Sequence, residues 1–297
     1  MKHILGVVGV GLMGRPIAEN LKNKGFEVYA YDLNKQTLKE LEEEGIKSTE
    51  NPKELIEKVD VLLDVLNDTN HFRDVLDEEN GILKGINGRK IVIDMTTSDP
   101  EKSKPIGAEL KEYGVEYLDC PMTGGRVGAR NGELIIMAGG DKKVFEEVRY
   151  ILDAISKELV YLGGMGSGHY MKLIHNQLSH STFLASCEAF NLGRELGIDE
   201  EAMIKVFNVG NARSYATEVR FPKFILSGTY DAGASFYTVG KDISLIAKKA
   251  NELNYDLPIT RATFDYWRYA IETGNGDEDY SKIVNLMVKK HNDRNPK

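Results

Sequence analysis

Gly9-Val10-Gly11-Leu12-Met13-Gly14 decides the fold, because this stretch joins a strand pattern to a helix pattern. Residues 4–8 form a short apolar run, and residues 15–21 carry apolar side chains at helical spacing. In such a turn the first glycine permits the sharp bend, the second lets the backbone approach a pyrophosphate, and the third lets the helix pack on the strand. The helix N-terminus attracts phosphate through its free N–H groups. The six residues therefore predict a dinucleotide-binding site.

Asp32 supports this prediction and indicates which dinucleotide binds. It ends a second apolar run at residues 27–31, at the distance where an acidic residue accepts hydrogen bonds from the adenosine ribose. A carboxylate repels the additional phosphate of NADP, so the sequence favours NAD as the cofactor. Lys35 follows closely and offers a cation to such a phosphate, so NADP remains the less favoured alternative.

Composition limits the classes of protein to which the chain can belong. Its 297 residues exceed the usual length of one domain, about 150 residues, and 41% of them are hydrophobic, which favours two domains with large cores. A net charge of −8 argues against nucleic acid and membrane surfaces as partners.

The two cysteines, Cys120 and Cys187, are too few for a disulfide framework or a metal cluster. We therefore expect no metal and a cytoplasmic location. The first apolar run is too short for a signal peptide, and no later stretch approaches the roughly 18 apolar residues that span a bilayer.

Strand and helix patterns alternate along the first half of the chain. Strand patterns recur at residues 59–66, 90–95, 115–119 and 134–138, which predicts an α/β fold of the Rossmann type, a doubly wound sheet with its ligand crevice at the carboxyl ends of the strands. A glycine cluster at residues 163–168 marks the expected boundary, with an NAD-binding domain at residues 1–164 and an all-α domain at residues 165–297. A long interdomain helix is expected at residues 169–195, followed by helices at residues 199–207, 221–226, 237–253, 261–273 and 279–290.

Two segments carry the groups expected to perform chemistry. Residues 119–129 follow a strand, and their glycines can turn backbone N–H groups toward a carboxylate, with the Thr123 hydroxyl as a further donor. Lys172 and Asn176 lie four residues apart, on one face of the long helix. A lysine held there can exchange a proton with a substrate hydroxyl.

Three segments together resemble the β-hydroxyacid dehydrogenase family, which includes 3-hydroxyisobutyrate dehydrogenase and tartronate semialdehyde reductase. They are the glycine turn, the segment Asp119-Cys120-Pro121-Met122-Thr123-Gly124-Gly125, and the segment from Gly166 to Asn176. The resemblance covers essentially the full chain and includes Phe236 before the pair Lys241-Asp242. It implies that Lys172 is catalytic, and that Thr123, Gly124, Gly125 and Asn176 bind substrate. It also implies that Leu66, Asn67, Thr96 and Lys241 lie near the nicotinamide half of the cofactor.

The chain departs from the family pattern at three places. It has Thr123 where serine is usual, Asn67 where proline is usual, and His175 where asparagine is usual. The threonine methyl group narrows the pocket, which allows a substrate different from the commonest ones of the family.

The roles of four further residues are not assigned by the sequence, because each has both a functional and a structural explanation. These are Arg126, His169, His175 and Arg213, of which His175 fits a packing role better than direct proton transfer, since it lies off the Lys172 face.

The resulting hypothesis is an oxidoreductase that transfers hydride between NAD and a small β-hydroxy acid, similar to 3-hydroxyisobutyrate, or its semialdehyde. We expect a homo-oligomer, either a dimer or a tetramer, whose contacts lie in the helical domain. The alternatives are a 6-phosphogluconate-type dehydrogenase and a non-catalytic dinucleotide-binding protein.

Overall fold

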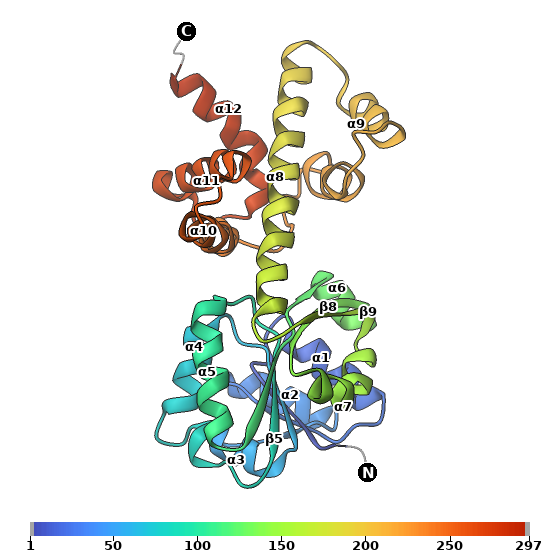
Figure 1. Cartoon of the computed structure of the whole chain (residues 1–297). Helices are drawn as coiled ribbons and strands as arrows, with labels where there is room; N and C mark the ends of the chain where they lie inside the picture. The colour runs from blue at the N-terminus through green and yellow to red at the C-terminus, as the bar shows by residue number, and fades with distance from the viewer. Residues whose placement is uncertain (1–2, 295–297) are drawn as a thin grey trace. The chain divides into compact units, whose positions relative to one another are not determined.

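The computed structural model describes residues 3–294 and consists of two compact units, Met1–Lys172 and Leu173–Lys297 (Figure 1). The division falls within the long helix α8 (Ser167–Glu195) and not in the glycine cluster before it. The physical reason is that the first turn of α8 bonds to the end of a strand in the first unit.

The first unit is built on one twisted sheet. Its strands are β1 (Leu5–Val8), β2 (Val28–Tyr31), β3 (Lys47–Ser48), β4 (Val61–Asp64), β5 (Lys90–Asp94), β6 (Val115–Asp119), β7 (Met122–Thr123), β8 (Leu134–Gly140) and β9 (Ser156–Gly163). They lie in the order β3-β2-β1-β4-β5-β6-β8-β7, and β9 pairs with β8. The first six strands are parallel, in the order found in dinucleotide-binding folds, which confirms the predicted fold class.

The far side of the sheet differs from the simple alternation that the sequence pattern indicates. Strand β8 runs antiparallel to β6 and to β7. The connection from β6 to β8 contains only β7 and the seven-residue helix α6 (Gly125–Asn131), which is about 10 Å long. So short a helix does not carry the chain back along the sheet for a parallel return.

Helices cover both faces of the sheet (Figure 1). They are α1 (Gly14–Asn23), α2 (Lys35–Glu43), α3 (Pro52–Lys58), α4 (Thr69–Asp77), α5 (Pro100–Glu112), α6 and α7 (Lys142–Asp153), with the short 3₁₀ turn η1 (Ile82–Lys84). Side chains along each strand point alternately to the two faces, so Leu5 and Val7 join one apolar core while Val8 joins the other. Both faces are therefore buried, as a parallel sheet requires.

The second unit is helical. It contains most of α8, followed by α9 (Glu200–Val209), η2 (Ala216–Ile225), α10 (Phe236–Glu252), α11 (Pro258–Ala270), η3 (Ile271–Asn275), η4 (Tyr280–Lys282) and α12 (Ile283–Arg294). Buried aromatic residues, among them Phe183, Phe221, Phe236 and Trp267, form its core. Within residues 3–294, no helix combines the length and the apolar composition needed to cross a membrane.

The helix expected at residues 221–226 begins earlier and is wider than predicted. Element η2 is a π-helix that starts at Ala216 and contains Pro222. Proline has no N–H to donate, so it interrupts the bonding of a regular α-helix at this point.

Gly14 is where the fold tolerates a side chain least. A Cβ atom there would lie 1.8 Å from the carbonyl oxygen of Gly9, whereas a Cβ atom on Gly11 would meet no atom within 4 Å. We expect Gly14→Ala to destabilise the first unit by about 1–3 kcal/mol through overpacking and to lower its thermal unfolding midpoint. Gly11→Ala is the matched control and should leave the midpoint unchanged. Equal midpoints for the two variants, measured by calorimetry, would contradict this explanation of the turn.

Candidate functional site

The carboxyl ends of four parallel strands in the first unit meet at one edge of the sheet. Strand β1 lies beside β4, β4 beside β5, and β5 beside β6, all in the same direction. The glycine turn follows β1, Leu66 and Asn67 follow β4, Thr96 follows β5, and the segment with Thr123 follows β6. Ligands of open α/β sheets bind at this edge.

The glycine turn has the geometry that a pyrophosphate requires. Gly9 has a φ of +85°, which other residues rarely adopt, and Gly14 lets α1 approach the turn closely. The space beside Gly11 is open, and Leu12 is exposed at the tip of the turn. No described side chain caps the N-terminus of α1 at Met13, so its N–H groups are not occupied by a capping side chain. The turn therefore fits a dinucleotide.

Asp32 is tied directly to this turn. One carboxylate oxygen accepts the N–H of Val10 at 2.8 Å, and the other accepts the N–H of Asn34 at 2.8 Å. Each oxygen keeps a further lone pair, with which it can accept a ribose hydroxyl. The contact with Val10 also aligns the end of β2 with the turn after β1, a role that the motif alone does not reveal.

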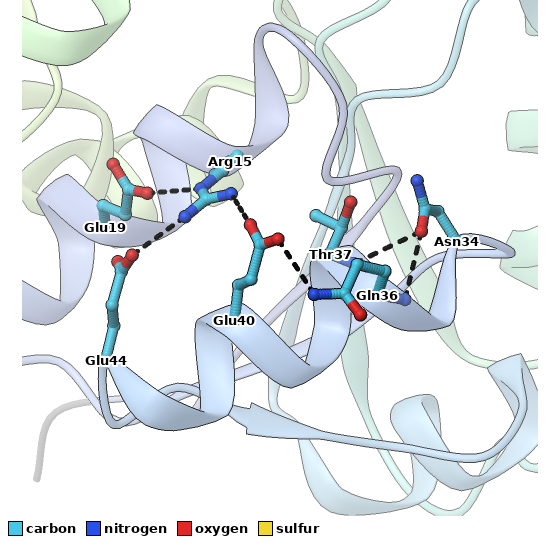
Figure 2. A network of polar contacts seen from close by, with 7 residues as sticks. All are labelled: Arg15, Glu19, Asn34, Gln36, Thr37, Glu40 and Glu44. Carbon is cyan, nitrogen blue, oxygen red and sulfur yellow. Dashed lines mark hydrogen bonds and ion pairs between the residues drawn. The ribbon is translucent and has the colours of Figure 1, made fainter.

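A charged network begins at Arg15, the residue that follows the glycine turn. Arg15 of α1 pairs with Glu19 at 2.8 Å, with Glu44 at 2.9 Å and with Glu40 (Figure 2). Glu40 belongs to α2, the helix that follows Asp32, so the network joins the two helices that carry the cofactor motifs. Three carboxylates thus face one guanidinium.

Strands β4, β5 and β6 each end in a buried aspartate, and these residues were missed as functional candidates. Asp64, Asp94 and Asp119 lie opposite one another in the sheet register, and none is exposed. The signal was present in the sequence as an aspartate in or at the end of each of the three strand patterns at residues 59–66, 90–95 and 115–119. Burial, reinforced by the charge of Asp94, raises the pKa of Asp64 well above its usual range.

Asp94 is the hydrogen-bonding centre of this row. It accepts the backbone N–H of Thr96 at 2.9 Å and the Thr96 hydroxyl at 2.6 Å, and it also accepts the hydroxyl of Tyr117. The ring of His169 lies 3.6 Å from the same carboxylate. Burial raises the pKa of Asp94, but His169 and these hydrogen bonds outweigh it and hold the pKa below its usual value. Thr96 is therefore oriented by the Asp94 carboxylate.

The segment predicted to hold a carboxylate combines a short strand with two glycines of positive φ. Thr123 pairs with Ile135 of β8 and is half-buried. Gly124 has a φ of +121° and Gly125 a φ of +61°, and a Cβ atom on Gly125 would meet no atom within 4 Å. The next residue, Arg126, is exposed. Non-glycine residues would strain this backbone, which explains the glycine pair.

Lys172 lies in the second turn of α8 and is buried, with 9% of its surface exposed. The turn before it contains Gly166 and His169, whose N–H groups donate to the Asp119 carboxylate at 2.8 and 2.9 Å. His169 itself is fully buried, and its ring bonds Ser103 at 2.9 Å, which assigns it a structural contact.

Asn176 lies one helical turn after Lys172, on the same face of α8. Its amide donates to the buried carboxylate of Asp242 at 2.7 Å, and Lys241 lies 3.5 Å from the other oxygen of Asp242. The His175 ring contacts the Asn176 amide oxygen at 3.1 Å. The second unit thus gathers Asn176 and Lys241 around Asp242, a residue that the sequence hypothesis did not assign.

Arg213 is exposed and lies 3.6 Å from Glu218.

Two family models cover most of the chain. Residues 4–163 match the NAD-binding domain of 6-phosphogluconate dehydrogenase, and residues 166–287 match the NAD-binding domain of NADP-dependent 3-hydroxyisobutyrate dehydrogenase. The chain belongs to the β-hydroxyacid dehydrogenase family. The match of the helical unit decides against the 6-phosphogluconate-type alternative. As a β-hydroxyacid dehydrogenase, the chain is an NAD(P)-dependent oxidoreductase that acts on a hydroxyl group.

Similar proteins share this β-hydroxyacid dehydrogenase architecture over nearly their whole length. The chain is 29% identical to 2-(hydroxymethyl)glutarate dehydrogenase of Eubacterium barkeri, over 95% of this chain and 94% of that protein. It is 28% identical to mitochondrial 3-hydroxyisobutyrate dehydrogenase of Mus musculus, over 96% and 87% of the two chains. The crystal structure of 3-hydroxyisobutyrate dehydrogenase from Salmonella typhimurium superposes with a TM-score of 0.86 at 26% identity, over 96% of this chain and all of that chain.

The role of Asp32 can be tested by removing its charge while keeping its shape. We expect Asp32→Asn to lower the ratio of kcat/KM with NAD to kcat/KM with NADP by about tenfold, because a carboxylate no longer repels the additional phosphate. Asp60→Asn is the matched control, since Asp60 accepts the N–H of Ile4 at the opposite end of β1. An unchanged ratio in Asp32→Asn, or a wild-type preference for NADP, would show that Asp32 does not select the cofactor.

Proposed function

We propose that the chain transfers hydride between NAD and a small β-hydroxy acid, similar to 3-hydroxyisobutyrate, or its semialdehyde, and that Lys172 transfers the accompanying proton. The observation that carries this proposal is the buried position of Lys172, directly after a helix turn that is bonded to the end of β6. A buried lysine next to the ligand edge of a Rossmann sheet is suited to proton transfer.

During oxidation the neutral Lys172 amine accepts the proton of the substrate hydroxyl, and during reduction the ammonium group returns it to the forming alkoxide. The bound nicotinamide supplies the hydride acceptor or donor. Asn176 assists because one hydrogen of its amide is held by Asp242, which leaves the other for the substrate oxygen.

The substrate carboxylate is assigned to Thr123, Gly124 and Gly125. Two consecutive glycines with positive φ and open space at Gly125 support this role, because a carboxylate can approach their backbone closely. The methyl group of Thr123 occupies space that serine would leave free, so we expect a preference among substrates that differ near the carboxylate.

We assign the adenosine half of the cofactor to residues 9–14 and Asp32, and the nicotinamide half to Leu66, Asn67, Thr96 and Lys241. Asp64 supports the loop after β4 by accepting the N–H of Leu66 at 3.0 Å, and Asp94 orients Thr96. NAD is preferred over NADP because the Asp32 carboxylate repels an additional phosphate on the adenosine ribose.

The relatives narrow the choice of substrate. The names of the two relatives above describe 3-hydroxyisobutyrate and 2-(hydroxymethyl)glutarate as substrates, and both molecules carry a hydroxymethyl group next to the carbon that bears a carboxylate. A first experiment is therefore an initial-rate panel of 3-hydroxyisobutyrate, 3-hydroxypropionate, 4-hydroxybutyrate, glycerate, serine and hydroxymethylglutarate, each with NAD and NADP. Turnover of none of them would refute the proposed function.

Lys172→Ala should lower kcat on the best substrate by about 10² or more, because it removes the proton-transfer group, while the affinity for NADH stays unchanged. Lys172→Arg should not restore kcat, since arginine stays protonated. Lys90→Met is the matched control, because Lys90 is also buried in the first unit but bonds Val59 at the amino end of β5. Near-wild-type turnover in Lys172→Ala would mean that another group moves the proton.

We also propose that the chain forms a homo-oligomer through α8. Ile174, Leu178 and Leu192 of this helix and Leu196 directly after it are exposed, and with 3.6 residues per turn the three helical residues fall on one narrow face. An exposed apolar stripe of this length is typical of an interaction surface. It can pair with the same stripe of a second copy across a two-fold axis, because such an interface uses the same surface on both copies.

The double variant Leu178→Asp/Leu192→Asp should therefore shift the mass measured by light scattering from the dimer or tetramer to the monomer, because it buries charge in the interface. Leu12→Asp and Leu33→Asp place the same charge on exposed leucines of the first unit and serve as the control. A monomeric wild-type protein would contradict the proposal.

The cytoplasm is the proposed compartment. Its support is that Cys120 and Cys187 are both free and buried thiols, as expected in a reducing environment. Some relatives are mitochondrial or chloroplastic by name, so fractionation of the source cells is the measurement that decides.

A further inference from the structure

We propose that Asp119 is a positioning residue for Lys172, and that it connects the substrate-carboxylate segment to the proton-transfer group. The proposal rests on the proposed role of Lys172 and adds a residue that sets its position. Asp119 ends β6 and is followed by the segment that leads to Thr123, so one side chain is attached to both parts of the site.

Both oxygens of the Asp119 carboxylate are used to hold α8. One oxygen accepts the N–H of Gly166 at 2.8 Å and the other accepts the N–H of His169 at 2.9 Å. These two N–H groups belong to the start of the helix, where no earlier carbonyl can accept them. Because two donors bind two different oxygens, the contact fixes both the position and the rotation of the first turn.

The first turn of α8 also packs closely against the strand ends. A Cβ atom on Gly168 would lie 2.3 Å from the carbonyl oxygen of Asp119 and 2.4 Å from that of Met137. A Cβ atom on Gly139 of β8 would lie 2.7 Å from the Asp119 carboxylate. The first turn of α8 thus lies directly on the ends of β6 and β8, and Asp119 is enclosed between them.

The side chain of His169 adds a second attachment. Its ring bonds the Ser103 hydroxyl of α5 at 2.9 Å and lies 3.6 Å from Asp94, which orients Thr96. Lys172 follows His169 by three residues and therefore lies on an adjoining part of the same helix face. A change at Asp119 that releases the turn would displace the Lys172 ammonium relative to the substrate-carboxylate segment.

The test is Asp119→Asn, which keeps the volume of the side chain but can accept only one of the two N–H groups, since its NH₂ group faces the other. We expect kcat to fall by about 10- to 100-fold through misplacement of Lys172, with KM for NAD unchanged. The double variant Asp119→Asn/Lys172→Ala should be no slower than Lys172→Ala, because Asp119 acts through Lys172. Additive losses, or an unchanged kcat, would overturn the proposal.

Amide hydrogen exchange supplies a readout that does not depend on turnover. In the wild-type protein the amides of Gly166 and His169 should exchange slowly, and Asp119→Asn should remove this protection while α7 keeps its own. The matched control is Asp141→Ala, which removes a carboxylate that caps α7 through the N–H groups of Lys143 and Val144. It should leave kcat unchanged.

The experiments distinguish failure of the proposed function from failure of the positioning role of Asp119. If the wild-type protein oxidises none of the panel substrates, the proposed function fails, and the exchange measurement alone decides whether Asp119 holds the helix. If the wild-type protein is active and Lys172→Ala is not, but Asp119→Asn keeps full kcat, only the positioning role fails. If Asp119→Asn does not fold, fast exchange of Gly166 and His169 in the wild-type protein overturns the proposal, and slow exchange supports it.

Discussion

The parallel register of β4, β5 and β6 places three buried carboxylates in one row, and the candidate site depends on how each is satisfied. Three neighbouring aspartates in a low-dielectric environment cannot all carry charge unless each finds donors. Asp94 finds them in Thr96 and Tyr117, with the His169 ring 3.6 Å away, and Asp119 finds them at the start of α8. Asp64 has one oxygen without a hydrogen-bond partner, in keeping with its raised pKa.

Because the buried aspartates need hydrogen-bond donors, they fix the positions of the segments that supply those donors. The donors that satisfy Asp94 and Asp119 lie on α8, on β6 and in the loop after β5, so those segments are held together at the sheet edge. The cofactor motifs are also held by charged side chains, on the other side of β1. There Asp32 accepts a hydrogen bond from the glycine turn, and Arg15 joins α1 to α2. The glycine turn, Thr96 and the first turn of α8 are thus each held by an aspartate.

The partners of the functional groups are mostly absent from the recognisable motifs. Asn176 is part of a motif, whereas the contact that orients its amide comes from Asp242, 66 residues away. Thr96 was expected near the nicotinamide, yet its orientation comes from Asp94, which the sequence shows only as the last residue of an apolar run. Such partners are chosen by three-dimensional proximity, so spacing along the chain does not reveal them.

The sequence by itself determined the fold class, the glycine turn, Asp32 and the existence of the long helix, because these features depend on local periodicity and on residues close together in the chain. It also determined the family, through motifs that extend over the full chain. Only the tertiary structure decided that β8 runs antiparallel to β6, that η2 is a π-helix, and that the division of the chain falls within α8. It alone revealed that the three aspartates lie side by side and that Asp119 accepts hydrogen bonds from the start of α8. Strand register and helix docking bring together residues that are 25 to 50 positions apart, which sequence patterns do not show.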